Sequence, residues 1–85
     1  MEISIEIERL QGQKIELARY RDELLGIKRK LLVHKANLNS HWIGEEMREI
    51  NYVLEDIDRR LQKVCNHIEE IESEISRIIA RGMEN

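Results

Sequence analysis

Residues 47–78 read MREINYVLEDIDRRLQKVCNHIEEIESEISRI, and this stretch decides the fold. Its apolar residues are spaced alternately three and four apart, which is the heptad pattern of a helix that packs along one face. They are Met47, Ile50, Leu54, Ile57, Leu61, Val64, Ile68, Ile71, Ile75 and Ile78. The pattern predicts one helix over about residues 44–82. Arg77 and Arg81 would lie near its C-terminus, where the helix dipole favours cations, and Gly82 would cap it.

The first half of the chain carries a less regular apolar repeat. It begins with Ile3, Ile7 and Leu10 and resumes with Leu17, Tyr20, Leu24, Ile27, Leu31 and Leu38. Between Leu10 and Leu17 it passes Gly12 and two polar residues, so we expect a shift of phase there, with local unwinding or a partner contact. Ile3, Ile5 and Ile7 also alternate as in a strand, but so short a run carries little weight. We predict a helix over about residues 2–37.

The two predicted helices are joined by NLNSHWIG, residues 37–44. Asn, Ser and Gly favour turns and caps, so we expect a turn over about residues 38–44, with Ser40 capping the second helix. Two arms of nearly equal length, each roughly 54 Å long at 1.5 Å per residue, then fold back on each other. The predicted fold is all-α: a single domain over residues 1–85, formed by an antiparallel two-helix hairpin that pairs into a four-helix bundle.

The distribution of charge supports the antiparallel arrangement. Residues 19–35 contain six basic and two acidic residues, whereas residues 45–58 contain six acidic residues and one basic residue. Folding near residue 41 places these two blocks side by side. Each exposed ion pair is worth little, but the summed pattern favours antiparallel over parallel pairing.

The first predicted helix has a wider apolar face than a two-helix contact requires. Three doublets recur seven residues apart: Leu17 and Ala18, Leu24 and Leu25, Leu31 and Leu32. A two-helix seam needs one residue of each doublet, so the other indicates a second neighbour. We expect these six residues to form a partner face in a homodimer or a heterodimer with another helical hairpin.

Composition and charge limit the classes of function. The net charge of −3 argues against a nucleic-acid partner, and no apolar run approaches the roughly 18 residues that span a membrane. The opening MEISIEIERL is acidic and lacks the features of a secretory signal peptide, so we expect the chain to be made in the cytoplasm. The sequence offers no nucleophile with a base and no glycine-rich phosphate loop. It therefore predicts neither an enzyme nor a cofactor.

Some polar residues have both a functional and a structural interpretation. The basic run KRKLLVHK, residues 28–35, suits an anionic lipid or nucleic acid, or neutralises the acidic start of the second helix. His34, His41 and His67 lack the spacing of a metal site. Cys65, the only cysteine, suits either an intermolecular disulfide or packing as a small apolar residue. In each case we favour the structural interpretation.

Trp42, Ile43 and Gly44 lie in the expected turn. A Trp there can cap the end of the apolar seam, while Gly lets the chain turn closely past it. An aromatic residue at an exposed tip is also a typical anchor for a partner. The chain resembles the Trp-X-Gly family of small type VII secretion proteins of Gram-positive bacteria. They are helical hairpins of about this length with Trp-X-Gly in the central loop. The resemblance covers the whole chain in length and architecture, and in residues it rests on Trp42 and Gly44.

The resemblance implies a function. It implies a non-catalytic secretion adaptor, exported without a secretory signal peptide, that binds a helical partner such as the helical N-terminal domain of a type VII toxin. The family also carries a Tyr-X-X-X-Asp/Glu secretion motif, usually after the second helix. Tyr52 and Asp56 have this spacing but lie early in the second helix. The alternative is a structural homo-oligomeric coiled-coil subunit of a phage or cell-envelope assembly, in which Trp42 serves packing only.

Overall fold

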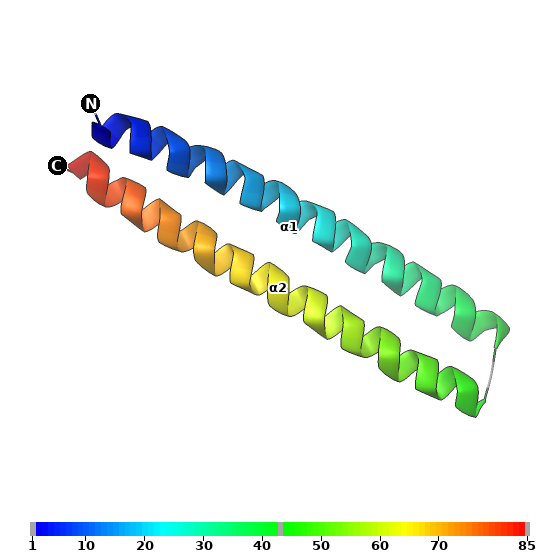
Figure 1. Cartoon of the computed structure of the whole chain (residues 1–85). Coiled ribbons are helices and arrows are strands. Elements are labelled where there is room, and N and C mark those ends of the chain that lie inside the picture. The colour runs from blue at the N-terminus through cyan, green and yellow to red at the C-terminus, as the bar shows by residue number, and fades with distance from the viewer. Residues whose placement is uncertain (1, 43, 85) are drawn as a thin grey trace.

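The computed structural model describes residues 2–42 and 44–84. Two helices account for nearly all of them: α1 spans Glu2–His41 and α2 spans Glu45–Glu84. The helices run antiparallel and pack along their length, so that the start of α1 and the end of α2 lie together opposite the turn (Figure 1). The hairpin measures 63 × 14 × 13 Å. The predicted all-α helical hairpin is confirmed.

The turn is shorter than the sequence indicates, because α1 continues to His41. The polar residues that suggested a loop instead satisfy carbonyl groups at the end of α1. The amide of Asn39 donates to the Lys35 carbonyl at 2.7 Å, and the Ser40 hydroxyl donates to the Asn37 carbonyl at 2.7 Å. Ser40 therefore belongs to the last turn of α1, and its predicted capping of α2 is wrong.

Gly44, and not Ser40, is the residue that immediately precedes α2. Its carbonyl accepts the first hydrogen bond of the helix, from the Arg48 amide at 3.2 Å, and its φ is +126°. Only glycine adopts such a backbone conformation without strain. At the other end, α2 passes through Gly82 to Glu84, so the predicted C-terminal cap at Gly82 is also wrong.

A matched pair of glycine substitutions tests the strain at Gly44. An added Cβ would meet nothing within 4 Å at either Gly44 or Gly12, so the two sites differ in backbone conformation alone. We expect Gly44→Ala to lower the free energy of unfolding by about 1–2 kcal/mol. We expect Gly12→Ala, inside α1, to raise it by about 0.5–1 kcal/mol. Urea unfolding followed by circular dichroism measures both, and equal effects would contradict this account of the turn.

Only half of the predicted α2 seam faces α1. The inner row consists of Met47, Leu54, Leu61, Ile68 and Ile75, and its members are buried or half-buried. The row beside it also contacts α1, and it consists of Asn51, Asp58, Cys65, Glu72 and Ile79. The contact with α1 is therefore rotated by one row from the all-apolar seam that the sequence predicts.

The matching face of α1 alternates leucine with basic residues. Leu10, Leu17, Leu24, Leu31 and Leu38 form one row, and Lys14, Arg21, Lys28 and Lys35 form the other. The four basic residues are half-buried. The repeat therefore runs past Gly12 without a change of phase, and α1 is continuous there, so the predicted unwinding is wrong. The repeat is not apparent from apolar spacing alone, because Lys14 occupies a seam position with a polar side chain.

The basic row of α1 is paired with polar residues of α2. Arg21 Nη1 donates to Glu72 Oε1 at 2.7 Å, and the side chains are 26% and 11% exposed. Lys28 Nζ donates to Gln62 Oε1 at 2.5 Å and lies 3.9 Å from Asp58 Oδ1. That longer distance is an ion pair without a hydrogen bond, and Asp58 Oδ1 is buried without a hydrogen-bond partner among the described residues. An unsatisfied buried acceptor weakens the contact between the helices.

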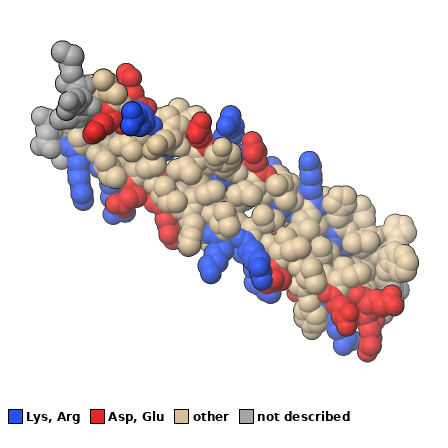
Figure 2. All heavy atoms as spheres, viewed as in Figure 1, with Lys and Arg blue, Asp and Glu red and all other residues tan. Residues whose placement is uncertain are grey.

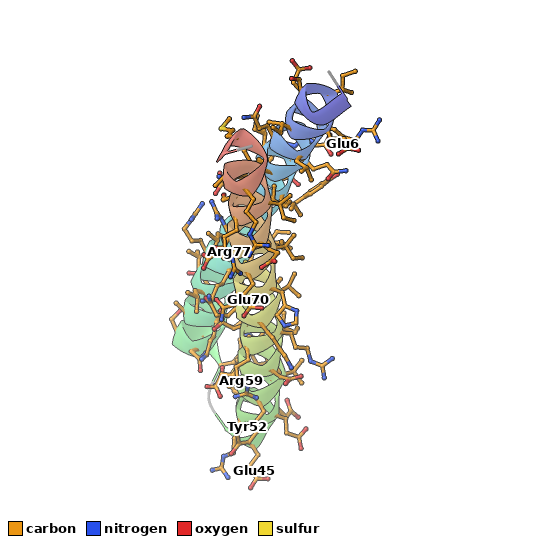
Figure 3. The ribbon with its side chains drawn as sticks, turned by 90° about the vertical axis from the view of Figure 1, so that its left-hand side faces the viewer. Glu6, Glu45, Tyr52, Arg59, Glu70 and Arg77 are labelled. Carbon is orange, nitrogen blue, oxygen red and sulfur yellow. The ribbon has the colours of Figure 1, made fainter. Side chains whose placement is uncertain are left out.

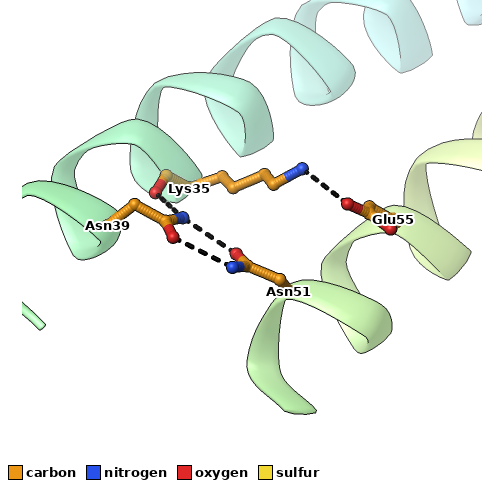
Figure 4. A network of polar contacts seen from close by, with 4 residues as sticks. All are labelled: Lys35, Asn39, Asn51 and Glu55. Atoms are coloured by element: carbon orange, nitrogen blue, oxygen red, sulfur yellow. Dashed lines mark hydrogen bonds and ion pairs between the residues drawn. The ribbon is translucent and has the colours of Figure 1, made fainter. Parts of the chain in front are cut away.

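The polar contacts fix the register near the turn (Figure 4). Lys35 Nζ donates to Glu55 Oε1 at 3.1 Å, and the side-chain amides of Asn39 and Asn51 bond reciprocally at 2.8 and 2.9 Å. The step from Lys35 to Lys28 along α1 equals the step from Glu55 to Gln62 along α2, so the register is constant. The predicted blocks of charge meet only in part: Lys35 pairs with Glu55 and Lys28 lies near Asp58, whereas Arg21 pairs with Glu72, beyond the acidic block of residues 45–58.

Candidate partner-binding surface

A row of exposed apolar residues runs along α2, and we call it the outer row. It consists of Ile50, Ile57, Val64, Ile71 and Ile78, which are 42%, 40%, 48%, 49% and 45% exposed. Their spacing of seven keeps them on one side of α2 over roughly 42 Å at 1.5 Å per residue. A continuous apolar stripe of this length is typical of a protein-binding surface. The sequence places these residues in the seam with α1, whereas the structure leaves them outside it.

Tyr20 and Ile27 extend this surface onto α1, where they are 48% and 52% exposed. The same seven-residue row of α1 continues to His34 and His41, which line a hollow with Trp42. Trp42 and Leu38 in turn line a hollow with Ile50 of the outer row. The opposite side of the hairpin carries the Lys35–Glu55 ion pair. The outer row of α2 thus lies on the same side of the hairpin as Tyr20 and Ile27 of α1, and we call this side the open face.

The partner residues that the sequence predicts on α1 occupy two environments. Leu17, Leu24 and Leu31 are half-buried in the row that faces α2. In the adjacent row Ala18 and Leu25 are half-buried, and Leu32 is 50% exposed. Leu32 lines a hollow with Lys35 and Glu55, on the side opposite the open face. The structure therefore exposes more apolar surface on α2 than on this face of α1.

Trp42 stands at the tip of the hairpin and is 63% exposed. Its amide donates to the Leu38 carbonyl at 2.9 Å, which carries the backbone one residue beyond α1. Its side chain borders a hollow of about 380 Å³ that is lined by Leu38, Trp42, Glu46, Met47 and Ile50. Met47 is only 5% exposed and closes the end of the inner row, so Trp42 retains a largely free ring. Gly44 is also exposed, and Ile43 lies outside the described residues.

Acidic side chains surround the tip. Glu45 and Glu46 occupy the first turn of α2, where the positive end of the helix dipole stabilises them, and both are exposed. Figure 2 shows acidic side chains gathered at the turn end of the hairpin, and charged side chains of both signs along the edges of the uncharged surface between them. The tip therefore combines an exposed aromatic ring with negative charge.

Tyr52 and Asp56 lie on the outer surface of α2. Tyr52 is 65% exposed, and it projects from α2 along with Arg59 (Figure 3). The Asp56 carboxylate is 3.5 Å from Arg59 Nη2 and 3.0 Å from Arg60 Nε. The tyrosine is accessible, whereas the carboxylate of the motif is shared with two arginines of the same helix.

The structure also shows the surroundings of the basic run, the histidines and Cys65, for which we favoured structural roles. Lys28 and Lys35 of the basic run contact α2, as described above. His34, His41 and His67 are exposed, and the described residues contain no group of three or more His, Cys, Asp or Glu side chains placed to hold a metal ion. Cys65 is a free thiol, 1% exposed, and packs as an apolar residue in the seam. Neither α1 nor α2 has, within its described residues, the length of apolar sequence that crosses a membrane.

Comparisons with known protein families, curated proteins and solved structures found no match to this chain. The similarity to the Trp-X-Gly family therefore stays a prediction that rests on Trp42, Gly44 and the hairpin architecture.

Proposed function

We propose that this chain is a non-catalytic adaptor of the type VII secretion class, which docks on a helical protein. The observation that carries the proposal is the outer row of α2, which stays 40–49% exposed after α1 and α2 have packed. Burying such a stripe against another helix gains roughly 25 cal/mol per Å² of apolar surface. A monomeric hairpin gains none of this stabilisation.

The tip supports the secretion assignment in particular. An exposed Trp beside an apolar hollow presents a large ring that a partner can desolvate, and such residues dominate binding energies. Gly44 gives the turn its positive φ, so the motif has a structural reason for both of its defining residues. Export and the toxin partner follow from the family resemblance.

Capture from the native host tests the proposal. A tagged chain is recovered from cells and from medium, and the proteins bound to it are identified by mass spectrometry. We expect a larger protein with a helical N-terminal domain, and we expect Trp42→Ala to reduce its recovery about tenfold or more, since an anchor residue contributes 2 kcal/mol or more. Ile15→Ala is the matched control, because Ile15 is 71% exposed and lies away from the tip and the outer row.

The coiled-coil alternative gives a different result. The heptad rows of both helices favour it as a second candidate. In a structural homo-oligomer the chain is recovered with itself alone and inside the cell, and Trp42→Ala changes stability without changing the partner. That outcome would contradict the secretion proposal.

A further inference from the structure

The outer row of α2 is symmetric about its central residue. Its members follow each other at intervals of seven from Ile50 to Ile78, with Val64 in the middle. If a second α2 lies antiparallel across this row with the two copies of Val64 opposed, Ile57 meets Ile71 and Ile50 meets Ile78. The row is therefore complementary to itself, which a contact with twofold symmetry requires.

The charges beside the outer row share this symmetry. Glu46 precedes Ile50 by about one helical turn and Arg81 follows Ile78 by about one turn, and both are exposed. Antiparallel packing centred on Val64 places Glu46 of each copy opposite Arg81 of the other. Parallel packing would instead oppose Glu46 to Glu46 and Arg81 to Arg81, and like charges in contact are unfavourable.

α1 continues the open face with the same centre. Glu23 and Lys30 lie about one turn to either side of Ile27, and both are exposed. The Lys28–Gln62 hydrogen bond places Ile27 at nearly the same height along the hairpin as Val64. One twofold axis can thus pass through the middle of both helices, and it brings Glu23 of each copy opposite Lys30 of the other.

The other twofold arrangement would place α1 of one copy on α2 of the second. With the register of the hairpin, it would oppose residues of like charge three times along the contact. These pairs are Lys30 with Arg60, Glu16 with Glu74, and Arg9 with Arg81. Charge therefore selects between two arrangements that bury the same apolar rows.

The geometry points to a second copy of this chain as the occupant of the open face, with α2 packed antiparallel on α2 about a twofold axis at Val64. The inference rests on the proposed function, since it takes the outer row as a docking surface, and it assigns that row to a second copy of this chain in place of a different helical protein. It leaves the face of α1 that carries Leu32 outside the contact between copies.

The first test is the mass of the purified chain in solution, measured by light scattering over a dilution series. We expect about twice the 10.2 kDa of one chain. Val64→Glu and Val64→Lys should each give monomers with unchanged helical circular dichroism. The twofold axis would place the substituted residue of one copy against the same residue of the other, so that two like charges meet. Mixing the two variants should restore a dimer that contains one of each. A monomeric parent chain, or a failure of the mixture to associate, would overturn the inference.

The second test distinguishes the two arrangements by disulfide formation in a Cys65→Ala background. Val64→Cys should give at least about tenfold more covalent dimer than Ile15→Cys, since the dimer raises the effective concentration of opposed thiols. Circular dichroism checks that each variant stays helical. A cross-link that forms only when Val64→Cys is mixed with Ile27→Cys would identify the α1-on-α2 arrangement and overturn the inference.

Failure of the inference and failure of the proposed function give different results. If the pure chain is monomeric and a different helical protein from the host binds through Ile57 and Ile71, the inference is wrong and the proposed function stands. If neither a second copy nor another protein binds the open face, both are wrong.

Discussion

Ile68→Ala should lower the free energy of unfolding by about 2–4 kcal/mol, the range for truncating a buried aliphatic side chain. Ile68 is 9% exposed in the inner row, where it packs between α1 and α2. Removing its outer atoms leaves a cavity that two rigid helices cannot close fully. Urea unfolding followed by circular dichroism measures the change.

Ile71→Ala is the matched control, because Ile71 lies one helical turn away and is 49% exposed. Within a single hairpin it should cost less than about 1 kcal/mol, since little apolar surface is lost from the interior. Any further loss should depend on protein concentration, because it comes from the contact with a partner. If both substitutions cost the same at every concentration, the distinction between inner and outer rows is wrong.

Glu72→Ala should cost about 2–3 kcal/mol, because it leaves the half-buried Arg21 guanidinium without its carboxylate. A fully buried pair would lose more, but the Arg21 side chain is 26% exposed and water screens part of the charge. The double variant Arg21→Leu with Glu72→Leu should be as stable as the parent or more stable. It replaces an ion pair that must be desolvated with a layer of the kind found elsewhere in the seam. Equilibrium unfolding of the three proteins gives the comparison.

Arg77→Ala provides the surface control for this pair. Arg77 bonds to Glu74 on the outside of α2, where the side chains are 67% and 59% exposed. Its loss should change stability by less than about 0.5 kcal/mol. If Glu72→Ala has no larger effect than Arg77→Ala, the Arg21–Glu72 contact does not stabilise the hairpin.

The sequence was sufficient to predict the helices, their antiparallel order and the approximate position of the turn. Helical periodicity is a local property, and a short turn between two arms of nearly equal length favours antiparallel packing. The sequence also predicted that Trp42 lies at the tip of the hairpin. It could not predict that the ring would be 63% exposed, because capping the seam and projecting from the tip require the same residue.

Only the tertiary structure decided which face of α2 meets α1. The inner row of α2, which includes Leu54 and Leu61, lies between the apolar outer row and the row that contains Asp58 and Glu72. Periodicity alone predicts that the inner and outer rows together pack against α1. The basic row of α1 reverses that preference, because Arg21 and Lys28 need Glu72, Gln62 and Asp58 opposite them. The position of the turn also depended on hydrogen bonds that the sequence does not reveal. Asn39 and Ser40 donate to carbonyl groups within α1, so residues that usually end a helix lie in its last turn. The local spacing of residues therefore determined the helices of this protein. Which face of α2 packs against α1 depended on pairing polar groups that are distant in the sequence. That packing leaves the outer row exposed for a partner.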